Sequence, residues 1–367
     1  MRYSIILSLC LLVFSSALGQ QPIDVHNFKK TLNLEDHLKP IEVQDEILLA
    51  HAMASDGEHI LVLNDKEVPP IKAYRLKDGK YMGGFGSIGG GPGEFNMING
   101  SSFGVRKGQI IVQGQKYLRI YNIKPDANKI DFQLASETKI PVELGIINRG
   151  FLLEDDVYAA SIMGSPKNFV SFKISSPNLP QMEVQTSIND FGDYPNSYPD
   201  IPSTAYHHLY TGSLDYDYDG ETLVVAYGKV PQIRVFDLPS GLFRDIEIKP
   251  NHQQIEKLIP DPRGRSIANG IEMTGYQSRV KIGRNFIVTE YQESKSEKTA
   301  TSAMGNMRTV PLTDKMFLVF NKKGELIIKL TPPEWFEKYI ITPDDRMILF
   351  HPEIADQLFV LDLNQFI

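Results

Sequence analysis

Residues 222–249, TLVVAYGKVPQIRVFDLPSGLFRDIEIK, consist of short apolar runs separated by turn residues. The runs are rich in β-branched and aromatic residues, and glycine, proline or serine bounds each of them, as is typical of neighbouring strands in an antiparallel sheet. We expect the strands at Thr222–Lys229, Gln232–Leu238 and Phe243–Lys249. Ser240-Gly241 marks the tight hairpin between the last two strands.

This succession of strands recurs about every 50 residues along the chain, which indicates an internal structural repeat. Two other copies have strands at Gln109–Gln115, Tyr117–Ile123 and Asp131–Ile140, and at Asn285–Gln292, Lys315–Asn321 and Leu326–Leu330. Repeated four-stranded units of roughly 40–50 residues are the sequence signature of a β-propeller. We count six units after Glu46, so the sequence predicts an all-β, six-bladed β-propeller.

The last predicted blade ends one strand short. Its strands are expected at Tyr339–Thr342, Met347–His351 and Leu358–Leu363. Phe28–Leu34, ahead of the first blade, alternates apolar and polar side chains as a strand does. We therefore expect this N-terminal strand to pair with the last blade and close the ring, because closure removes an open sheet edge. A loose N-terminal arm is the alternative.

The segment that joins the first two predicted blades, YMGGFGSIGGGPGEF at residues 81–95, resembles a known protein family. It is similar to the blade-linking segment of NHL-like and TolB-like six-bladed propellers, where a glycine-aromatic-glycine strand end leads into a Gly-Pro-Gly-Glu-Phe turn. Residues 232–238, QIRVFDL, with the Ser240-Gly241 turn, are similar to the third strand and turn of those proteins. The resemblance implies an exported propeller of bacterial type, and it assigns no catalytic residues.

The first 19 residues have the pattern of a secretory signal peptide. Arg2 is positively charged, Ile5–Phe14 is an apolar run too short to span a bilayer, and residues 17–19 favour cleavage. We expect residues 20–367 to form one propeller domain, periplasmic or extracellular. Cys10, the only cysteine, lies inside the apolar run, so the mature chain is expected to contain no disulfide and no cysteine chemistry.

The composition is that of a soluble globular protein and argues against two classes of partner. Charged residues make up 23% and hydrophobic residues 42% of the chain, which is ordinary for such proteins. The formal net charge of −7 argues against nucleic acid and against anionic lipid as the main partner. No later apolar run is long enough for a membrane-spanning helix, so we expect no transmembrane segment.

The long connections of the predicted ring all fall on one face. Strands alternate in direction within a blade, so the connections between second and third strands and between blades emerge together. The four long connections, all of this kind, are Gly86–Ser101, Asn189–Tyr206, Pro250–Gly275 and Glu293–Asp314. Long structured loops gathered on one rim are a usual place for function. We therefore expect ligand binding on this long-loop face.

Aromatic and charged residues mark the expected binding site. The innermost strands begin at the long-loop face, and the residues expected at the channel mouth are Asn99, Glu143, His208, Tyr276, Arg279 and Tyr339. The long connections add Tyr206, Arg263, Arg265 and Arg308. Arginines gathered against an acidic net charge favour an anionic group on the ligand. The alternative is that they pair with carboxylates of the loops, namely Asp190, Asp193, Asp200, Asp261 and Glu272.

Three other patterns are incomplete. Residues 83–93 are rich in glycine but lack the Gly-Lys-Ser/Thr ending of a phosphate loop. Residues 215–220, DYDYDG, begin like a calcium loop, but the twelfth position is Ala226 instead of glutamate, so an Asp-Gly hairpin is favoured. His207 and His208 are adjacent and would point to opposite faces of a strand, which disfavours a shared metal ion.

These observations favour a monomeric, exported binding module that takes a glycan, a peptide or a cell-envelope protein, with no cofactor. The alternative is a metal-dependent, lactonase-like hydrolase with a cation in the central channel. Glu143 and Asn99, with residues 215–219 nearby, would supply oxygen ligands that select calcium or magnesium. Because no complete catalytic set is visible in the sequence, we expect a binding protein rather than an enzyme.

Overall fold

The structure is a computed structural model, and the part described here excludes residues whose placement is uncertain. The described residues are 21–91, 93–145, 147–154, 156–162, 165, 167–174, 189–195, 210, 212–252, 259–260, 267–268, 274–276, 279–298 and 307–366. The signal-like segment 1–19 and the cysteine within it lie outside these residues. Among the described residues, no helix is long and apolar enough to cross a membrane.

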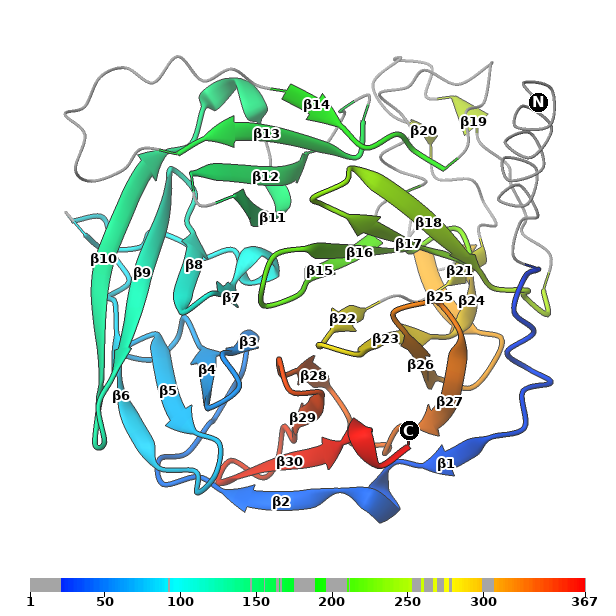
Figure 1. Ribbon diagram of the computed structural model, residues 1–367, viewed down its shortest axis with the longest axis horizontal. Helices are drawn as coiled ribbons and strands as arrows, with labels where there is room; N and C mark the ends of the chain where they lie inside the picture. The colour runs from blue at the N-terminus through cyan, green and yellow to red at the C-terminus, as the bar shows by residue number, and fades with distance from the viewer. Residues whose placement is uncertain are drawn as a thin grey trace, which may run out of the picture.

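Six sheets stand around a central channel like the blades of a propeller (Figure 1). The first blade consists of β3 (Ala52–Ser55), β4 (His59–Leu63), β5 (Ile71–Arg75) and β6 (Tyr81–Phe85). The second consists of β7 (Gly104–Arg106), β8 (Gln109–Gln113), β9 (Tyr117–Pro125) and β10 (Ile130–Lys139). The third consists of β11 (Ile147–Glu154), β12 (Val157–Ile162), β13 (Phe169–Lys173) and β14 (Asn189–Phe191).

The remaining three blades complete the ring and confirm the six-bladed, all-β prediction. The fourth blade consists of β15 (Gly212–Tyr216), β16 (Thr222–Tyr227), β17 (Gln232–Asp237) and β18 (Leu242–Glu247). The fifth contains β22 (Val280–Ile282), β23 (Phe286–Tyr291), β26 (Met316–Asn321), β27 (Leu326–Thr331) and β1 (Thr31–Asn33). The sixth contains β28 (Lys338–Ile341), β29 (Arg346–Phe350), β30 (Gln357–Asp362) and β2 (Lys39–Glu42). Short 3-10 helices lie at Glu35–His37, Gly100–Ser102, Val142–Leu144 and Leu363–Phe366.

Apolar packing between neighbouring blades holds the ring together. The second strands are apolar at nearly every position because a blade covers each of their faces, and β4 and β23 are buried throughout. The fourth strands face solvent on one side, and most of β18 is exposed. One cluster of buried side chains fills each space between adjacent blades; the cluster with Ile60 and Ile348 joins the first blade to the sixth.

An N-terminal strand closes the ring, but it is not the one expected from the sequence. Lys39–Glu42 pairs antiparallel with β30 and completes the sixth blade. The expected segment, Phe28–Leu34, instead contributes the short β1, which runs parallel to β27 of the fifth blade. The reason is packing: Leu34 is fully buried in the cluster between the fifth and sixth blades, and the chain reaches the edge of β30 only after it.

Residues 23–42 form a strap along the outside of three blades. Ile23 forms a parallel bridge to Ile248 at the end of the fourth blade. The Val25 carbonyl accepts a hydrogen bond from the Lys329 ammonium group, at 2.9 Å, and β1 and β2 follow on the fifth and sixth blades. Figure 1 shows this strap in blue along the outer edge of the ring.

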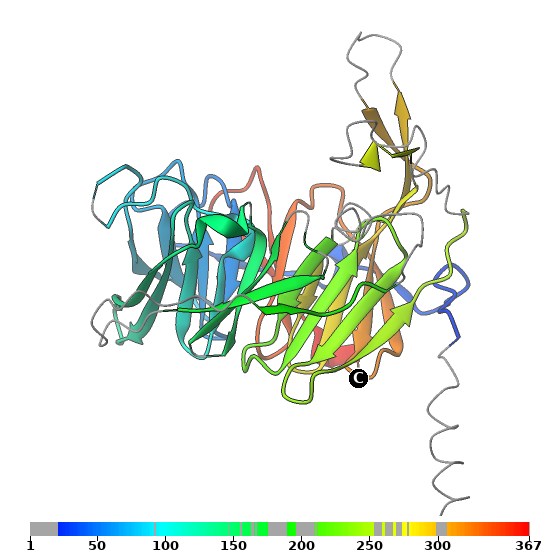
Figure 2. The same ribbon diagram turned by 90° about the horizontal axis from the view of Figure 1, so that it is seen from above.

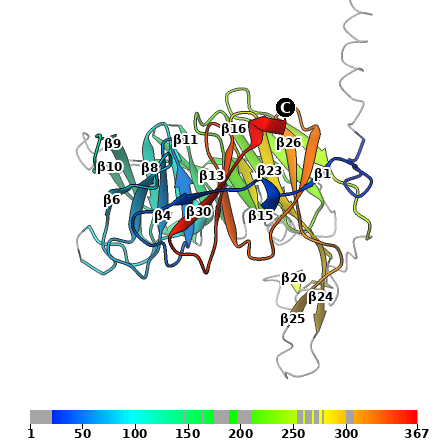
Figure 3. The same cartoon turned by 90° about the horizontal axis from the view of Figure 1, so that it is seen from below.

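A small sheet, which we call the arm, projects from one face of the ring (Figures 2 and 3). It contains β21 (Thr274–Tyr276), β24 (Glu293–Lys298) and β25 (Met307–Pro311). β24 and β25 form a hairpin inserted between β23 and β26, the second and third strands of the fifth blade. Two shorter strands, β19 (Ile259–Pro260) and β20 (Ile267–Ala268), pair with each other nearby.

Candidate functional site

A pocket of about 250 Å³ lies in the central channel, and we call it the channel pocket. All six inner strands contribute to its lining, so its wall combines residues that are far apart in the sequence. The strands approach closely where glycine occurs. A side chain on Gly104 would place its Cβ 2.5 Å from the Tyr216 hydroxyl oxygen, so glycine is required at this point of the wall.

The lining of the channel pocket is cationic although the protein is acidic. Arg149, Arg279, Lys281 and Lys338 line the pocket, and Asp215 is the one carboxylate among its described lining residues. The charge of the lining is opposite in sign to the net charge of −7. The cationic lining is therefore a local property of the inner strands and not a consequence of the overall composition.

Asp215 pairs with one of these cations, Lys281. Its carboxylate accepts a 2.9 Å hydrogen bond from the Ile282 amide and lies 3.4 Å from the Lys281 ammonium group. Burial raises the pKa of Asp215 above its ordinary value, and Lys281 opposes this shift. The pair forms one side of the wall, and the charge of Asp215 also acts on Arg149, although the two side chains form no ion pair.

Arg279 directly precedes β22, and three contacts hold it in place. Its Nε lies 3.5 Å from a carboxylate oxygen of Glu290, and its guanidinium donates a hydrogen bond to the Glu337 carbonyl. The Tyr339 hydroxyl donates to the Arg279 carbonyl and holds the backbone. Glu290 is buried, and burial raises its pKa, while Arg279 and Lys315 lower it. Arg279 thus has a distant counter-ion and an exposed guanidinium.

Arg149 and Lys338 have no close carboxylate partner among the lining residues, and the Lys338 ammonium group lies 3.8 Å from the carboxylate of Glu337 outside the lining. Within the described part of the chain, the Arg149 guanidinium forms no hydrogen bond and no ion pair. Burial and the charge of Arg279 lower its pKa, and the charge of Asp215 opposes this shift. The Lys338 ammonium group donates to the carbonyls of Ala50 and His51, the latter at 3.2 Å. Burial is also the main cause of the lowered pKa of Lys338; Glu337 opposes this shift and Arg279 adds to it. The positive charge of Arg279 therefore disfavours the charged forms of Arg149 and Lys338.

Only part of the site expected from sequence meets in the channel pocket. Arg279 and Tyr339 line it. Asn99 caps the 3-10 helix Gly100–Ser102 beside the pocket, and its amide donates to the carbonyls of Ile147 and Asn148.

Three other expected residues lie elsewhere. Glu143 is exposed on the 3-10 helix Val142–Leu144, outside the pocket lining, because that turn precedes the inner strand. Tyr276 is buried at the root of the arm, where its ring stacks on Tyr291. Arg308 lies in β25 of the arm, opposite Glu297. Tyr206, His208, Arg263 and Arg265 lie outside the described residues.

The acidic run at residues 215–220 forms the expected hairpin. Asp217 accepts hydrogen bonds from the amides of Glu221 and Thr222 and from the Lys322 ammonium group, at 2.8–3.0 Å. Gly220 supplies the positive φ of the turn, at 69°. Asp217 therefore ties the fourth blade to the fifth. Among the residues that the structure describes, no three His, Cys, Asp or Glu side chains are grouped so that they could hold a metal ion.

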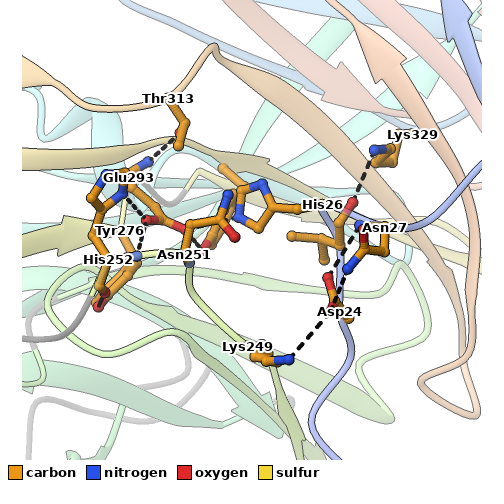
Figure 4. A network of polar contacts seen from close by, with 12 residues as sticks. Asp24, His26, Asn27, Lys249, Asn251, His252, Tyr276, Glu293, Thr313 and Lys329 are labelled. Carbon is orange, nitrogen blue, oxygen red and sulfur yellow. Dashed lines mark hydrogen bonds and ion pairs between the residues drawn. The ribbon is translucent and has the colours of Figure 1, made fainter.

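A second buried polar cluster joins the arm to the ring (Figure 4). The Glu293 carboxylate at the root of the arm is fully buried and accepts hydrogen bonds from the amides of Asn251 and His252 at 2.8 and 2.9 Å. The rings of His252 and His26 lie 2.7 and 2.8 Å from it, and the Tyr291 hydroxyl lies at 2.9 Å. We call this cluster the arm root.

Comparison with known proteins agrees with this architecture. The family model described as TolB-like 6-blade propeller-like matches residues 41–342. No curated protein sequence matches the chain significantly. A member of the DUF4221 family from Bacteroides vulgatus has a similar structure, with a TM-score of 0.55, 14% identity, and coverage of 89% of this chain and 95% of that one. A Bacteroides fragilis protein inferred to be exported is similar with a TM-score of 0.55, 10% identity, and coverage of 90% and 96%. At these identities the likeness concerns the fold alone.

Proposed function

This chain belongs to the family of TolB-like six-bladed propellers, and from that fold we propose that it is an exported, non-enzymatic binding module. In this proposal the ligand is held in the channel pocket and by the arm. Propellers carry many unrelated activities, so the fold alone does not identify the ligand, and the site must do so. Export is proposed from the signal-like pattern of the first 19 residues.

The observation that carries the proposal is that the arm continues into the wall of the channel pocket. β21 of the arm ends at Tyr276, and Arg279 of the pocket follows only three positions later in the sequence. The pocket also reaches His51 and Ser101, which precede inner strands and so belong to the same face as the connections between blades. A ligand seated in the pocket from this face would therefore meet the base of the arm.

The size of the pocket restricts what can enter it. About 250 Å³ lies just below the usual range of small-molecule sites, so one sugar ring or one side chain fits and a folded domain does not. The proposed ligand is therefore a glycan or a peptide, free or displayed by a cell-envelope protein. One unit of it occupies the pocket, and the arm contacts the rest.

A shortened arm tests this proposal. Lys295 and Val310 are paired across the β24–β25 hairpin, so an Asn-Gly turn can replace residues 296–309 and leave Glu293 and its contacts in place. The wild-type chain is first screened on a glycan array and a peptide array, and the affinities of the ligands found are measured by calorimetry. We expect the shortened chain to bind them at least tenfold more weakly at an unchanged melting temperature. Equal affinity of the two chains, or a wild-type chain that binds nothing on either array, would contradict the proposal.

A further inference from the structure

We propose that the channel pocket binds a small oxyanion, a carboxylate or a phosphate group of the ligand, between Arg149 and Arg279, with Lys338 beside them. This inference rests on the proposed function and specifies the chemistry of its ligand. It begins from the charges that the described part of the pocket leaves uncompensated.

The uncompensated charge lies on one side of the pocket. Lys281 has Asp215 as its partner, and Arg279 lies 3.5 Å from a carboxylate oxygen of Glu290. Lys338 has a longer contact, 3.8 Å to the Glu337 carboxylate, whereas Arg149 forms no ion pair among the described residues. The lowered pKa values of Arg149 and Lys338 are consistent with this geometry, because each responds to burial and to Arg279. Like charges held close together are unfavourable, and more so where burial limits their hydration, as at Arg149; an anion between them would relieve the repulsion.

The arrangement suits an oxyanion better than a halide or a neutral hydroxyl group. A guanidinium group is planar and presents paired donors that match two oxygens of a carboxylate or a phosphate. Arg149 has its donors unused among the described residues, and Arg279 is held in place by Glu337 and by the hydroxyl of Tyr339. The buried Tyr216 hydroxyl also lacks a hydrogen-bond partner in the described structure and lines the same pocket.

A purely structural role for these arginines fits the contacts less well. A structural arginine in a propeller of this kind has a closely placed carboxylate, as Arg234 has in Asp245, with two contacts of 2.6 Å. Arg149 has no such partner among the described residues, and Arg279 lies 3.5 Å from its carboxylate. Arg234 therefore provides an internal reference for a satisfied arginine.

The experiment measures stabilisation by anions. The melting temperature is recorded in acetate and in phosphate against chloride, at equal ionic strength, for the wild type, Arg149→Ala, Arg279→Ala and Arg244→Ala. Arg244 lies exposed on the outer strand β18, so its variant controls for general salt effects. At tenfold excess over the dissociation constant, the anion should raise the melting temperature of the wild type and the Arg244 variant by about 2 °C. The Arg149 and Arg279 variants should lose this increment.

Direct binding of matched sugars separates the two possible anions. Galacturonate, galactose 6-phosphate and galactose are titrated by calorimetry; the first two test a carboxylate and a phosphate, and galactose is the neutral control. We expect at least one acidic sugar to bind, and Arg149→Ala and Arg279→Ala each to weaken it about 30-fold or more. Arg279→Lys should restore part of the affinity.

Two results would overturn the oxyanion site. One is an equal anion increment in all four chains, and the other is binding of galactose as tight as that of the acidic sugars. Neither result affects the shortened-arm test, in which arm-dependent binding of array ligands would remain. Conversely, anion binding that requires both arginines in a chain with no array ligand would uphold the oxyanion site and contradict the binding-module proposal.

Discussion

The arm root and the channel pocket are both polar clusters, but they differ in burial and in how their charges are satisfied. Glu293 in the arm root is surrounded by five donors, from the strap, the connection after β18 and β23. In the channel pocket, Arg149 has no partner among the described residues. A buried charge with all its hydrogen bonds made rigidifies a fold, whereas an unsatisfied one is costly and marks a place where a ligand can add stability.

The pKa shifts express the same difference. Burial alone would raise the pKa of Glu293, but hydrogen bonds from the Asn251 amide, from His252 and from His26 outweigh it, so the pKa is lowered and the charged form is favoured. At Arg149, burial and the charge of Arg279 act in the same direction and disfavour the charged form. The surroundings of Glu293 in the arm root therefore stabilise its charged form, whereas the surroundings of Arg149 in the channel pocket disfavour its charged form.

The largest expected effect comes from removing the carboxylate of the arm root. Glu293→Ala leaves five donors without an acceptor and should lower the free energy of unfolding by about 3–5 kcal/mol. Urea denaturation measures this, with Glu353→Ala at an exposed position as the control. A loss below about 1 kcal/mol would show that the arm root is not a stabilising cluster and would break the comparison.

Two neighbouring aspartates give a second, smaller contrast within one strand-turn segment. Asp217 satisfies three donors and its pKa is lowered, whereas Asp215 faces the channel pocket and its pKa is raised. Asp217→Ala should cost about 1–3 kcal/mol, because the amides of Glu221 and Thr222 lose their acceptor. Asp215→Asn should cost less. Parallel unfolding curves test the order, and equal losses would contradict it.

Acid should remove part of the contribution of Glu293. Because its folded-state pKa lies below the ordinary value of 4.5, its contribution is complete above that pH and is lost as the pH falls through the folded-state pKa. The difference in unfolding free energy between the wild type and Glu293→Gln should therefore shrink between pH 6 and pH 3. A difference independent of pH would mean that the carboxylate charge is not what stabilises the arm root.

The smallest expected effect on stability belongs to the channel pocket. Arg149→Ala removes a guanidinium that has no partner in the described structure and relieves repulsion from Arg279. The free energy of unfolding in chloride buffer should change by no more than about 0.5 kcal/mol, or rise. A loss comparable to that of Glu293→Ala would place Arg149 among the structural residues and remove the distinction between the two clusters.

The sequence predicts the blades well because their stability is local. The second and third strands of each blade are covered on both faces, so they appear as continuous apolar runs, and tight turns such as that at Gly220 mark their ends. The closing strand was assigned too early in the chain because Lys39–Glu42 is short and polar. Its place depends on the edge of β30, more than 300 residues away.

Lining residues of the channel pocket can be predicted from the sequence only where an inner strand begins without a bulge or register shift. Arg279 and Tyr339 lie at such starts, and both line the pocket. Arg149 was missed because the register of β11 shifts between Ile147 and Arg149, which changes the direction of the side chains in a way that sequence periodicity does not show. Glu293 appears in the sequence only as the first residue of the long connection Glu293–Asp314, because its partners His26 and His252 are brought to it by the tertiary fold alone.

The strap has a consequence for the order in which the molecule forms. Its contacts join residues as distant in sequence as Val25 and Lys329, so the segment that leaves the ribosome early finds its partners only when the chain is nearly complete. Contacts of such sequence separation are slow to form. Until β1 pairs with β27 and β2 pairs with β30, the outer edges of the last two blades stay open to other chains. We therefore expect ring closure to be the late, aggregation-sensitive step of folding. A chaperone that covers strand edges would then act at the edges of β27 and β30.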